Sequence, residues 1–218
     1  MFANAKDNTI TIKRVFYGGP AQKAGLRHSD KIIRVEGEEM AATDNNDAVA
    51  VMRGEFGGEV TITILREQEV FDVSMTRQPV QTEILIYELR EGDIAYIRVF
   101  YFEGNLMGQM EEAAQALIAE GAKGLVLDLR ENPGGLADLA ISLSDYFLDD
   151  QPILRTEDKY GRQRAFYGLN GAWEIPMVVL QDGYSASAAE ILSVALQENG
   201  RAKVVGTQSY GKGIMQSV

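Results

Sequence analysis

Ser187 and Lys212 are the residues of this sequence that could act as a nucleophile and its base. The chain contains one histidine, His28, which stands beside Ser29 and Asp30. This neighbourhood does not indicate a catalytic triad, because triad members meet in space and not along the chain. We expect His28 to occupy a surface turn, since polar residues favour such turns. A hydrolase built on this chain must use another base, and lysine is the alternative.

Ser187 lies in the sequence YSASAAE at 184–190, where an apolar strand is predicted to end and a helix to begin. The small neighbours Ala186 and Ala188 suit a sharp turn that presents a nucleophile. The start of a helix also supplies free N–H groups and a positive dipole end, which stabilise an oxyanion. However, Ser187 followed by Glu190 is equally a capping box, a common way to begin any helix. On the local sequence alone, the capping box is the simpler interpretation.

Lys212 stands between two glycines, and a lysine in a glycine turn is normally a solvated surface charge. Residues 206–213 also nearly match the phosphate-binding loop pattern, but Gly213 replaces the hydroxyl that would bind magnesium. A nucleotide-binding protein is therefore the weaker alternative, and residues 214–218 are more typical of a strand.

The sequence Asn-Pro-Gly-Gly at 132–135 joins a predicted strand to a predicted helix. It could be a simple tight connection, because glycine permits unusual backbone dihedrals. It could also direct a backbone N–H at a substrate oxygen, and the local sequence does not choose between these interpretations.

Two patterns of predicted elements divide the chain. Strands are predicted at 9–16, 31–35 and 59–65, and short helices at 20–25 and 44–53. From residue 92 onward the prediction alternates strands at 94–100, 124–129, 176–181 and 203–206 with helices at 109–120, 136–147 and 187–198. Strand, crossover helix and strand in sequence favour parallel pairing. The likeliest boundary lies within residues 76–89.

Composition excludes several classes of protein. The 218 residues are 45% hydrophobic and 24% charged, which is typical of a globular protein with room for two cores. The formal net charge of −11 and the lack of a basic run argue against a nucleic-acid partner. Cysteine is absent, so disulfides, thiolate metal sites and a cysteine nucleophile are excluded. The sequence shows neither an apolar stretch of about 20 residues nor a signal peptide.

The second half of the sequence resembles the C-terminal processing peptidases, also called tail-specific proteases. The stretches that carry this resemblance are DIAYIR at 93–98, GAKGLVLDLR at 121–130, NPGG at 132–135, SASA at 185–188, and GKG at 211–213 with Gln216. The separation between Ser187 and Lys212 is also the one that this family shows between nucleophile and base. The resemblance implies an α/β catalytic domain with a crotonase-like or ClpP-like βαβ core.

In that family, by resemblance, neutral Lys212 takes the proton from Ser187 Oγ, which attacks a peptide carbonyl. Gln216 would orient Lys212, and desolvation is the physical means of favouring a neutral lysine. This chemistry requires no metal or other cofactor.

The oxyanion would be held by two backbone donors, the N–H of Ala188 and that of Gly134 or Gly135. Each such donor is typically worth about 3–4 kcal/mol to the transition state.

The first third resembles the PDZ domain that precedes such catalytic domains, through GPAQKAGL at 19–26 and SDKIIRV at 29–35. Ser29 takes a turn position that is usually glycine, and we expect the strand and carboxylate-binding loop before Ile10 to be missing. We therefore predict a partly truncated β-rich PDZ domain at 1–78 and a catalytic domain at 79–218 without its last strands. A catalytically inactive PDZ peptide-binding protein is the alternative function.

The resemblance further implies protein or peptide substrates with accessible C-terminal tails, captured by the PDZ domain. It implies an extracytoplasmic location in the periplasm, cell envelope or lumen, and leaves homo-oligomerisation open.

Overall fold

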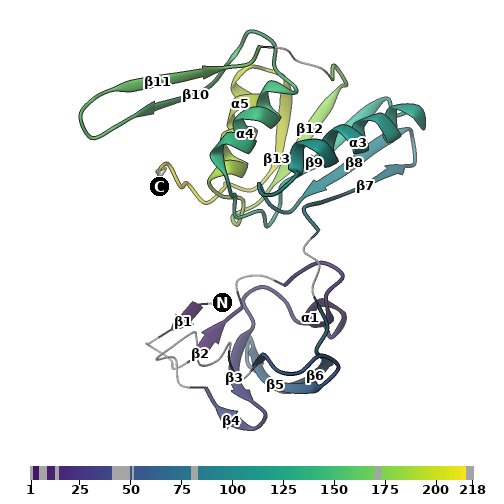
Figure 1. The fold of residues 1–218 in the computed structure, drawn as a ribbon, viewed down its shortest axis with the longest axis vertical. Helices are drawn as coiled ribbons and strands as arrows, with labels where there is room; N and C mark the ends of the chain where they lie inside the picture. The colour runs from purple at the N-terminus through teal and green to yellow at the C-terminus, as the bar shows by residue number, and fades with distance from the viewer. Residues whose placement is uncertain are drawn as a thin grey trace. The chain divides into compact units, whose positions relative to one another are not determined.

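The structure is a computed structural model that describes residues 2–4, 9–12, 15–40, 50, 52–79, 83–169 and 173–214. The chain forms two compact units, residues 1–83 and 84–218, drawn in purple to blue and in teal to yellow (Figure 1). The division falls within the predicted boundary segment at 76–89.

Unit 1 is a small antiparallel sheet with a one-turn helix. Among the described residues its strand order is β1-β2-β3-β5-β6, with β4 paired to β3. The elements are β1 (Phe2–Asn4), β2 (Thr9–Thr11), α1 (Pro20–Lys23), β3 (Lys31–Val35), β4 (Glu38–Glu39), β5 (Glu59–Arg66) and β6 (Glu69–Thr76). Alternation along the strands places β-branched side chains on one buried face. That core contains Ile10, Ile12, Leu26, Ile32, Val35, Val60, Ile62, Ile64 and Val73.

The start of unit 1 differs from the sequence prediction. The strand predicted at 9–16 is limited to Thr9–Thr11. Strand β1 precedes it and pairs with it in antiparallel register, so the expectation that no strand lies before Ile10 is wrong. Most of the helix predicted at 44–53 lies outside the described residues.

A tight turn before β3 confirms two details of the prediction. Ser29 has a φ of 69°, which explains why glycine is usual at this position. His28 lies in the same turn, half-buried, with its Nδ1 2.6 Å from Ser29 Oγ.

Unit 2 is a mixed sheet with the order β13-β12-β9-β8-β7 among the described residues. Strands β8, β9, β12 and β13 are parallel, and β7 is antiparallel to β8. The sheet strands are β7 (Leu85–Arg90), β8 (Ile94–Val99), β9 (Gly124–Asp128), β12 (Met177–Gln181) and β13 (Ala202–Gly206). Parallel strands need long crossovers. These contain α3 (Leu106–Ala119), α4 (Ala137–Asp145) and α5 (Ala188–Glu198). The predicted α/β fold of the second domain is confirmed.

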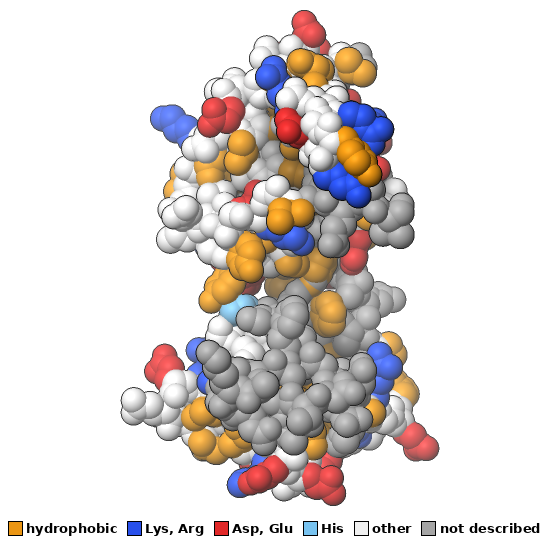
Figure 2. All heavy atoms as spheres, turned by 90° about the vertical axis from the view of Figure 1, so that its left-hand side faces the viewer, with side chains coloured by type: hydrophobic (Ala, Val, Ile, Leu, Met, Phe, Trp, Pro, Cys, Tyr) orange, Lys and Arg blue, Asp and Glu red, His pale blue; other side chains and the backbone are white. Residues whose placement is uncertain are grey.

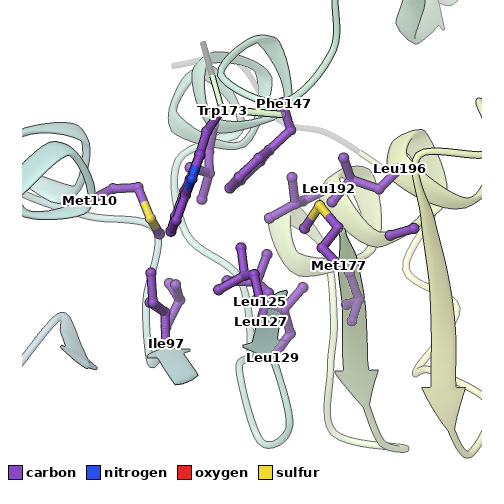
Figure 3. Packing of buried hydrophobic residues seen from close by; sticks show 14 of the residues in the cluster. Ile97, Met110, Leu125, Leu127, Leu129, Phe147, Trp173, Met177, Leu192 and Leu196 are labelled. Carbon is purple, nitrogen blue, oxygen red and sulfur yellow. The ribbon is translucent and has the colours of Figure 1, made fainter. Parts of the chain in front are cut away.

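The helices pack on one face of this sheet over a continuous apolar core (Figure 3). Leu125, Leu127 and Leu129 point from β9 and the residue after it toward the helices, and each is almost fully buried. The rings of Phe147 and Trp173 stack above them with their centroids 6.2 Å apart. Burying one leucine side chain contributes about 1.5–3 kcal/mol, so this layer fixes the strands whose ends carry the site.

Two apolar residues within the predicted helices are exposed. Ile118 is 54% exposed, because the buried stripe of α3 runs through Met110, Ala114 and Leu117 and leaves Ile118 at its margin. Leu136 is 61% exposed, because it is the N-cap of α4 rather than a residue inside the helix.

A two-stranded hairpin, β10 (Pro152–Glu157) with β11 (Gln163–Tyr167), projects from unit 2 (Figure 1). No helix in the described part of the chain is both long and apolar enough to cross a bilayer. On the face shown in Figure 2, described basic side chains form small groups among acidic ones.

Candidate active site

Ser187 occupies a strained turn between β12 and α5. Its backbone has φ 57° and ψ −116°, a conformation that L-residues rarely adopt and that typically costs about 1–3 kcal/mol. Asp182 stabilises the residues before Ser187, because its Oδ1 accepts the N–H groups of Tyr184 at 3.0 Å and Ser185 at 3.1 Å. Strain of this kind persists only where the surrounding structure enforces it, and it is concentrated at functional sites.

The glycine turn predicted at 132–135 lies directly against Ser187. A Cβ atom on Gly134 would stand 2.8 Å from Ser187 Cβ and 2.9 Å from the nitrogen of Ala188, so only glycine allows this approach. A Cβ on Gly135 would lie 2.2 Å from the carbonyl oxygen of Phe102. The structure thus brings together four of the predicted site residues, two from each turn.

The backbone donors of these two turns differ in availability. Gly134 donates its N–H to Asn132 Oδ1 at 2.8 Å. Within the described residues, the N–H groups of Gly135 and Ala188 donate to no protein acceptor. Of the two predicted glycines, Gly135 is therefore the one with an N–H available to a substrate oxygen in this conformation.

Glu190 connects the segment that carries Ser187 to the segment that carries Lys212. Its Oε2 accepts the backbone N–H of Ser187 at 2.7 Å and that of Lys212 at 2.9 Å. Its Oε1 accepts the hydroxyl of Ser209 at 2.7 Å and the N–H of Gly211 at 2.6 Å. Partial burial acts to raise the pKa of Glu190, but these four donors outweigh it and hold the pKa below its ordinary value.

Sequence reasoning recognised Glu190 only as half of a capping box. The structure contains the whole box, since the Ser187 side chain accepts the backbone N–H of Glu190 and the Glu190 carboxylate accepts the backbone N–H of Ser187. The contacts to Ser209, Gly211 and Lys212 are long-range, and the local pattern gave no signal for them.

Lys212 lies in an irregular segment after β13, and its side chain is exposed. The burial expected for a neutral lysine is therefore not supplied by the described residues. No helix follows up to Ile214, so the segment lacks the helix start that a phosphate-binding loop requires. Gln216, the residue predicted to orient Lys212, lies outside the described residues.

A buried carboxylate supports the glycine turn from the end of β9. Asp128 is fully buried and accepts the hydroxyl of Tyr96 at 2.7 Å and Nη2 of Arg130 at 2.6 Å. Desolvation acts to raise the pKa of Asp128, but the bonds from Arg130 and Tyr96 outweigh it and lower the pKa. The same network raises the pKa of Arg130 through its bond to Asp128. The bonds from Tyr96 and Arg130 to Asp128 therefore fix the end of β9, from which the chain enters the glycine turn.

The division of the chain into two units agrees with the family comparisons. The family model for peptidase family S41 matches residues 93–218, and the model for the PDZ domain matches residues 3–65. The chain belongs to peptidase family S41. Unit 1 is a PDZ domain and unit 2 is the S41 peptidase domain.

Relatives and solved structures support the same assignment. The carboxy-terminal processing protease CtpA of Bacillus subtilis (strain 168) is 34% identical over 215 residues, covering 97% of this chain and 46% of that protein. A carboxyl-terminal-processing protease of Synechocystis sp. is 34% identical over 223 residues, covering 99% of this chain and 52% of that one. The solved photosystem II D1 C-terminal processing protease has a TM-score of 0.74 at 27% identity, covering 96% of this chain and 59% of the other.

A putative S41 protease from Bacteroides fragilis, with a TM-score of 0.59 at 19% identity, shares the fold. The match covers 93% of this chain and 60% of the Bacteroides fragilis chain. The chain spans about half the length of the curated relatives it matches.

Proposed function

We propose that this S41 chain is the PDZ and catalytic part of a serine endopeptidase in which Ser187 is the nucleophile and Lys212 the general base. The observation that carries the proposal is the strained backbone of Ser187, at φ 57° beside two backbone N–H groups that donate to no described residue. The backbone N–H groups of Ser187 and Lys212 also share one oxygen of Glu190. The nucleophile and the base would thus be held by one carboxylate.

In the proposed reaction, Lys212 accepts the Ser187 Oγ proton as that oxygen attacks a peptide carbonyl carbon. The tetrahedral oxyanion receives hydrogen bonds from the N–H groups of Ala188 and Gly135. When the C–N bond breaks, Lys212 returns the proton to the leaving amine and an acyl-enzyme remains. Water then attacks the acyl carbon and gives a proton to Lys212; as the bond from that carbon to Ser187 Oγ breaks, Lys212 returns the proton to Oγ and the acid is released.

Lys212 must be neutral to accept a proton, yet its side chain is exposed in the free protein. We propose that the bound substrate covers it, because excluding water disfavours the charged ammonium. Gln216 would orient the amine in that complex. Catalysis would then begin only when a polypeptide fills the site.

The PDZ domain would select substrates by capturing a free C-terminal tail as an added strand, the usual mode of such domains. Tethering the tail raises the local concentration of the cleavable segment near Ser187. The family resemblance also underlies our proposal of an extracytoplasmic location, which cell fractionation would test.

The deciding experiment measures hydrolysis of a flexible peptide with an apolar C-terminus, in its free and amidated forms. We expect cleavage of the free form by the wild-type protein, none by Ser187→Ala, and slower cleavage of the amidated form. Tail binding without any cleavage would favour the inactive peptide-binding alternative. Equal rates for the two forms would show that tail capture does not set specificity.

A further inference from the structure

Asn132 is a fully buried polar residue at the start of the glycine turn. Its side-chain Nδ2 donates to the carbonyl of Val99 at 2.8 Å, and its Oδ1 accepts the N–H of Gly134 at 2.8 Å. A carbonyl on one side and an N–H on the other permit only one orientation of the amide. An unpaired buried polar group costs about 1–3 kcal/mol, so this arrangement is strongly held.

The main chain of Asn132 makes a third connection. Its carbonyl oxygen accepts the N–H of Ala186 at 2.9 Å, the residue before Ser187. One residue therefore joins the end of β8, the glycine turn and the serine turn. These are the segments whose relative positions decide where the N–H groups of Gly135 and Ala188 lie.

The two adjacent glycines make this bracing necessary. Glycine populates positive and negative φ about equally, so the peptide between Gly134 and Gly135 has little intrinsic preference for one direction. Asn132 engages the Gly134 N–H and thereby fixes the plane of the preceding peptide. Phe102 donates its N–H to the Gly134 carbonyl at 3.1 Å, and this bond holds the peptide between Gly134 and Gly135. Leu136 donates its N–H to the Phe102 carbonyl at 2.7 Å, which holds the residue after the turn.

We propose that Asn132 is a positioning residue that sets the geometry of the oxyanion site, by keeping the Gly134 N–H occupied and the Gly135 N–H available beside that of Ala188. This inference rests on the proposed function and assigns to it a residue that contacts neither substrate nor Ser187 Oγ. Its effect should fall on the acyl-transfer step, because the oxyanion exists only there.

The test compares Asn132→Asp with Asn199→Asp in the same protein. Aspartate keeps the size of asparagine and can still accept the Gly134 N–H, but it cannot donate to the Val99 carbonyl as a carboxylate. Asn199, which is half-buried, is the control: its Nδ2 donates to two carbonyls, those of Pro152 at 2.8 Å and Ala195 at 2.7 Å, so the same substitution removes amide-to-carbonyl bonds away from the glycine turn. It lies at the opposite end of α5, roughly 18 Å along the helix from Ser187.

We expect Asn132→Asp to lower kcat about 100-fold with KM within about threefold of wild type, the size of effect seen when one oxyanion donor is lost. Asn199→Asp should leave both constants within about threefold. Asn132→Ser provides a second variant, because a hydroxyl can accept the Gly134 N–H but is too short to reach Val99. Its kcat should fall between those of Asn132→Asp and Asn199→Asp.

A kcat for Asn132→Asp within threefold of wild type would overturn the inference. So would a parallel loss in Asn199→Asp, or loss of folded circular dichroism in both Asn132 variants, which would make the residue purely structural. Wild-type protein without activity, or Ser187→Ala with full activity, would instead overturn the proposed function.

Discussion

The two domains each contain a shielded carboxylate, but they balance its charge in different ways. In the PDZ domain, Asp30 is bound by the guanidinium of Arg66 through two bonds of 2.7 and 2.8 Å. In the S41 domain, Glu190 is bound by three backbone N–H groups and one hydroxyl, and no described cationic side chain pairs with it. Asp30 has its own counter-ion, whereas Glu190 depends on the correct placement of neutral dipoles.

The difference separates stability from function. The Asp30 ion pair closes the turn before β3 onto the end of β5. The Glu190 contacts instead bring together the chain segments of Ser187 and Lys212. Removing the first should make a domain less stable, and removing the second should lower the proposed activity of a protein that stays folded.

The largest effect is expected for the proposed nucleophile and base. Ser187→Ala and Lys212→Ala should each lower kcat/KM by more than about 10³-fold, and the double variant should lose little more, because members of one catalytic unit are not additive. Peptide hydrolysis followed by mass spectrometry measures this. Substantial activity left in either single variant would reject the dyad.

Glu190→Gln should lower kcat by about 10–100-fold while the protein stays folded. The amide keeps the shape of the side chain but turns one acceptor into a donor that faces the N–H groups or the hydroxyl. Bonds to a charged acceptor are worth about 1.5–3 kcal/mol, which corresponds to that loss of rate. Steady-state kinetics would check this, with thermal unfolding as a control for folding. An unchanged kcat would show that the Glu190 contacts do not support activity.

Asp30→Asn should show the opposite behaviour. Breaking this ion pair from the Asp30 side should destabilise the PDZ domain, because Arg66 loses its partner. Unfolding of the PDZ domain at lower denaturant concentration, with kcat for a short peptide within about twofold of wild type, is the expected pair of results. A large loss of kcat in Asp30→Asn would erase the distinction between the two carboxylates.

Acid should weaken both domains through these carboxylates. Burial acts against the charged form of Asp30, yet its bonds to Arg66 and the Arg27 N–H hold its pKa below the ordinary value, as the four donors do for Glu190. A depressed folded pKa gives stability that is present above the unfolded pKa and is lost as pH falls toward the folded one. The unfolding free energy of wild type should therefore decline below about pH 4.5. The unfolding free energy of Asp30→Asn should decline less over the same range. Urea titration from pH 7 to 3 measures both.

The smallest effect is expected for His28→Ala. The only imidazole of the chain lies in a PDZ turn beside Ser29 and belongs to neither carboxylate network. The pH dependence of kcat/KM should therefore keep its shape and position. Loss of activity in His28→Ala, with folding and tail binding intact, would mean that the wrong base was chosen.

How much of the structure can be predicted from the sequence depends on how far apart along the chain the contacting residues lie. The parallel strands and crossover helices were predictable, because apolar periodicity reports a buried face along a local stretch. Ser187, Ala188, Lys212 and the glycine turn were proposed as the site from motif spacing, and they stay a prediction. Asn132 and Glu190 were not assigned a function, since their decisive partners lie far along the chain, as Val99 does for Asn132.

The central claim is that Ser187 is a nucleophile activated by Lys212. The most direct test treats the protein with a fluorophosphonate, which forms a stable adduct with an activated serine, and maps the adduct by peptide mass spectrometry. We predict modification of Ser187 alone in wild type, and at least about a 100-fold slower reaction in Lys212→Ala, because the hydroxyl then lacks its base. Modification of another serine, or an equal rate of labelling in Lys212→Ala, would contradict this account.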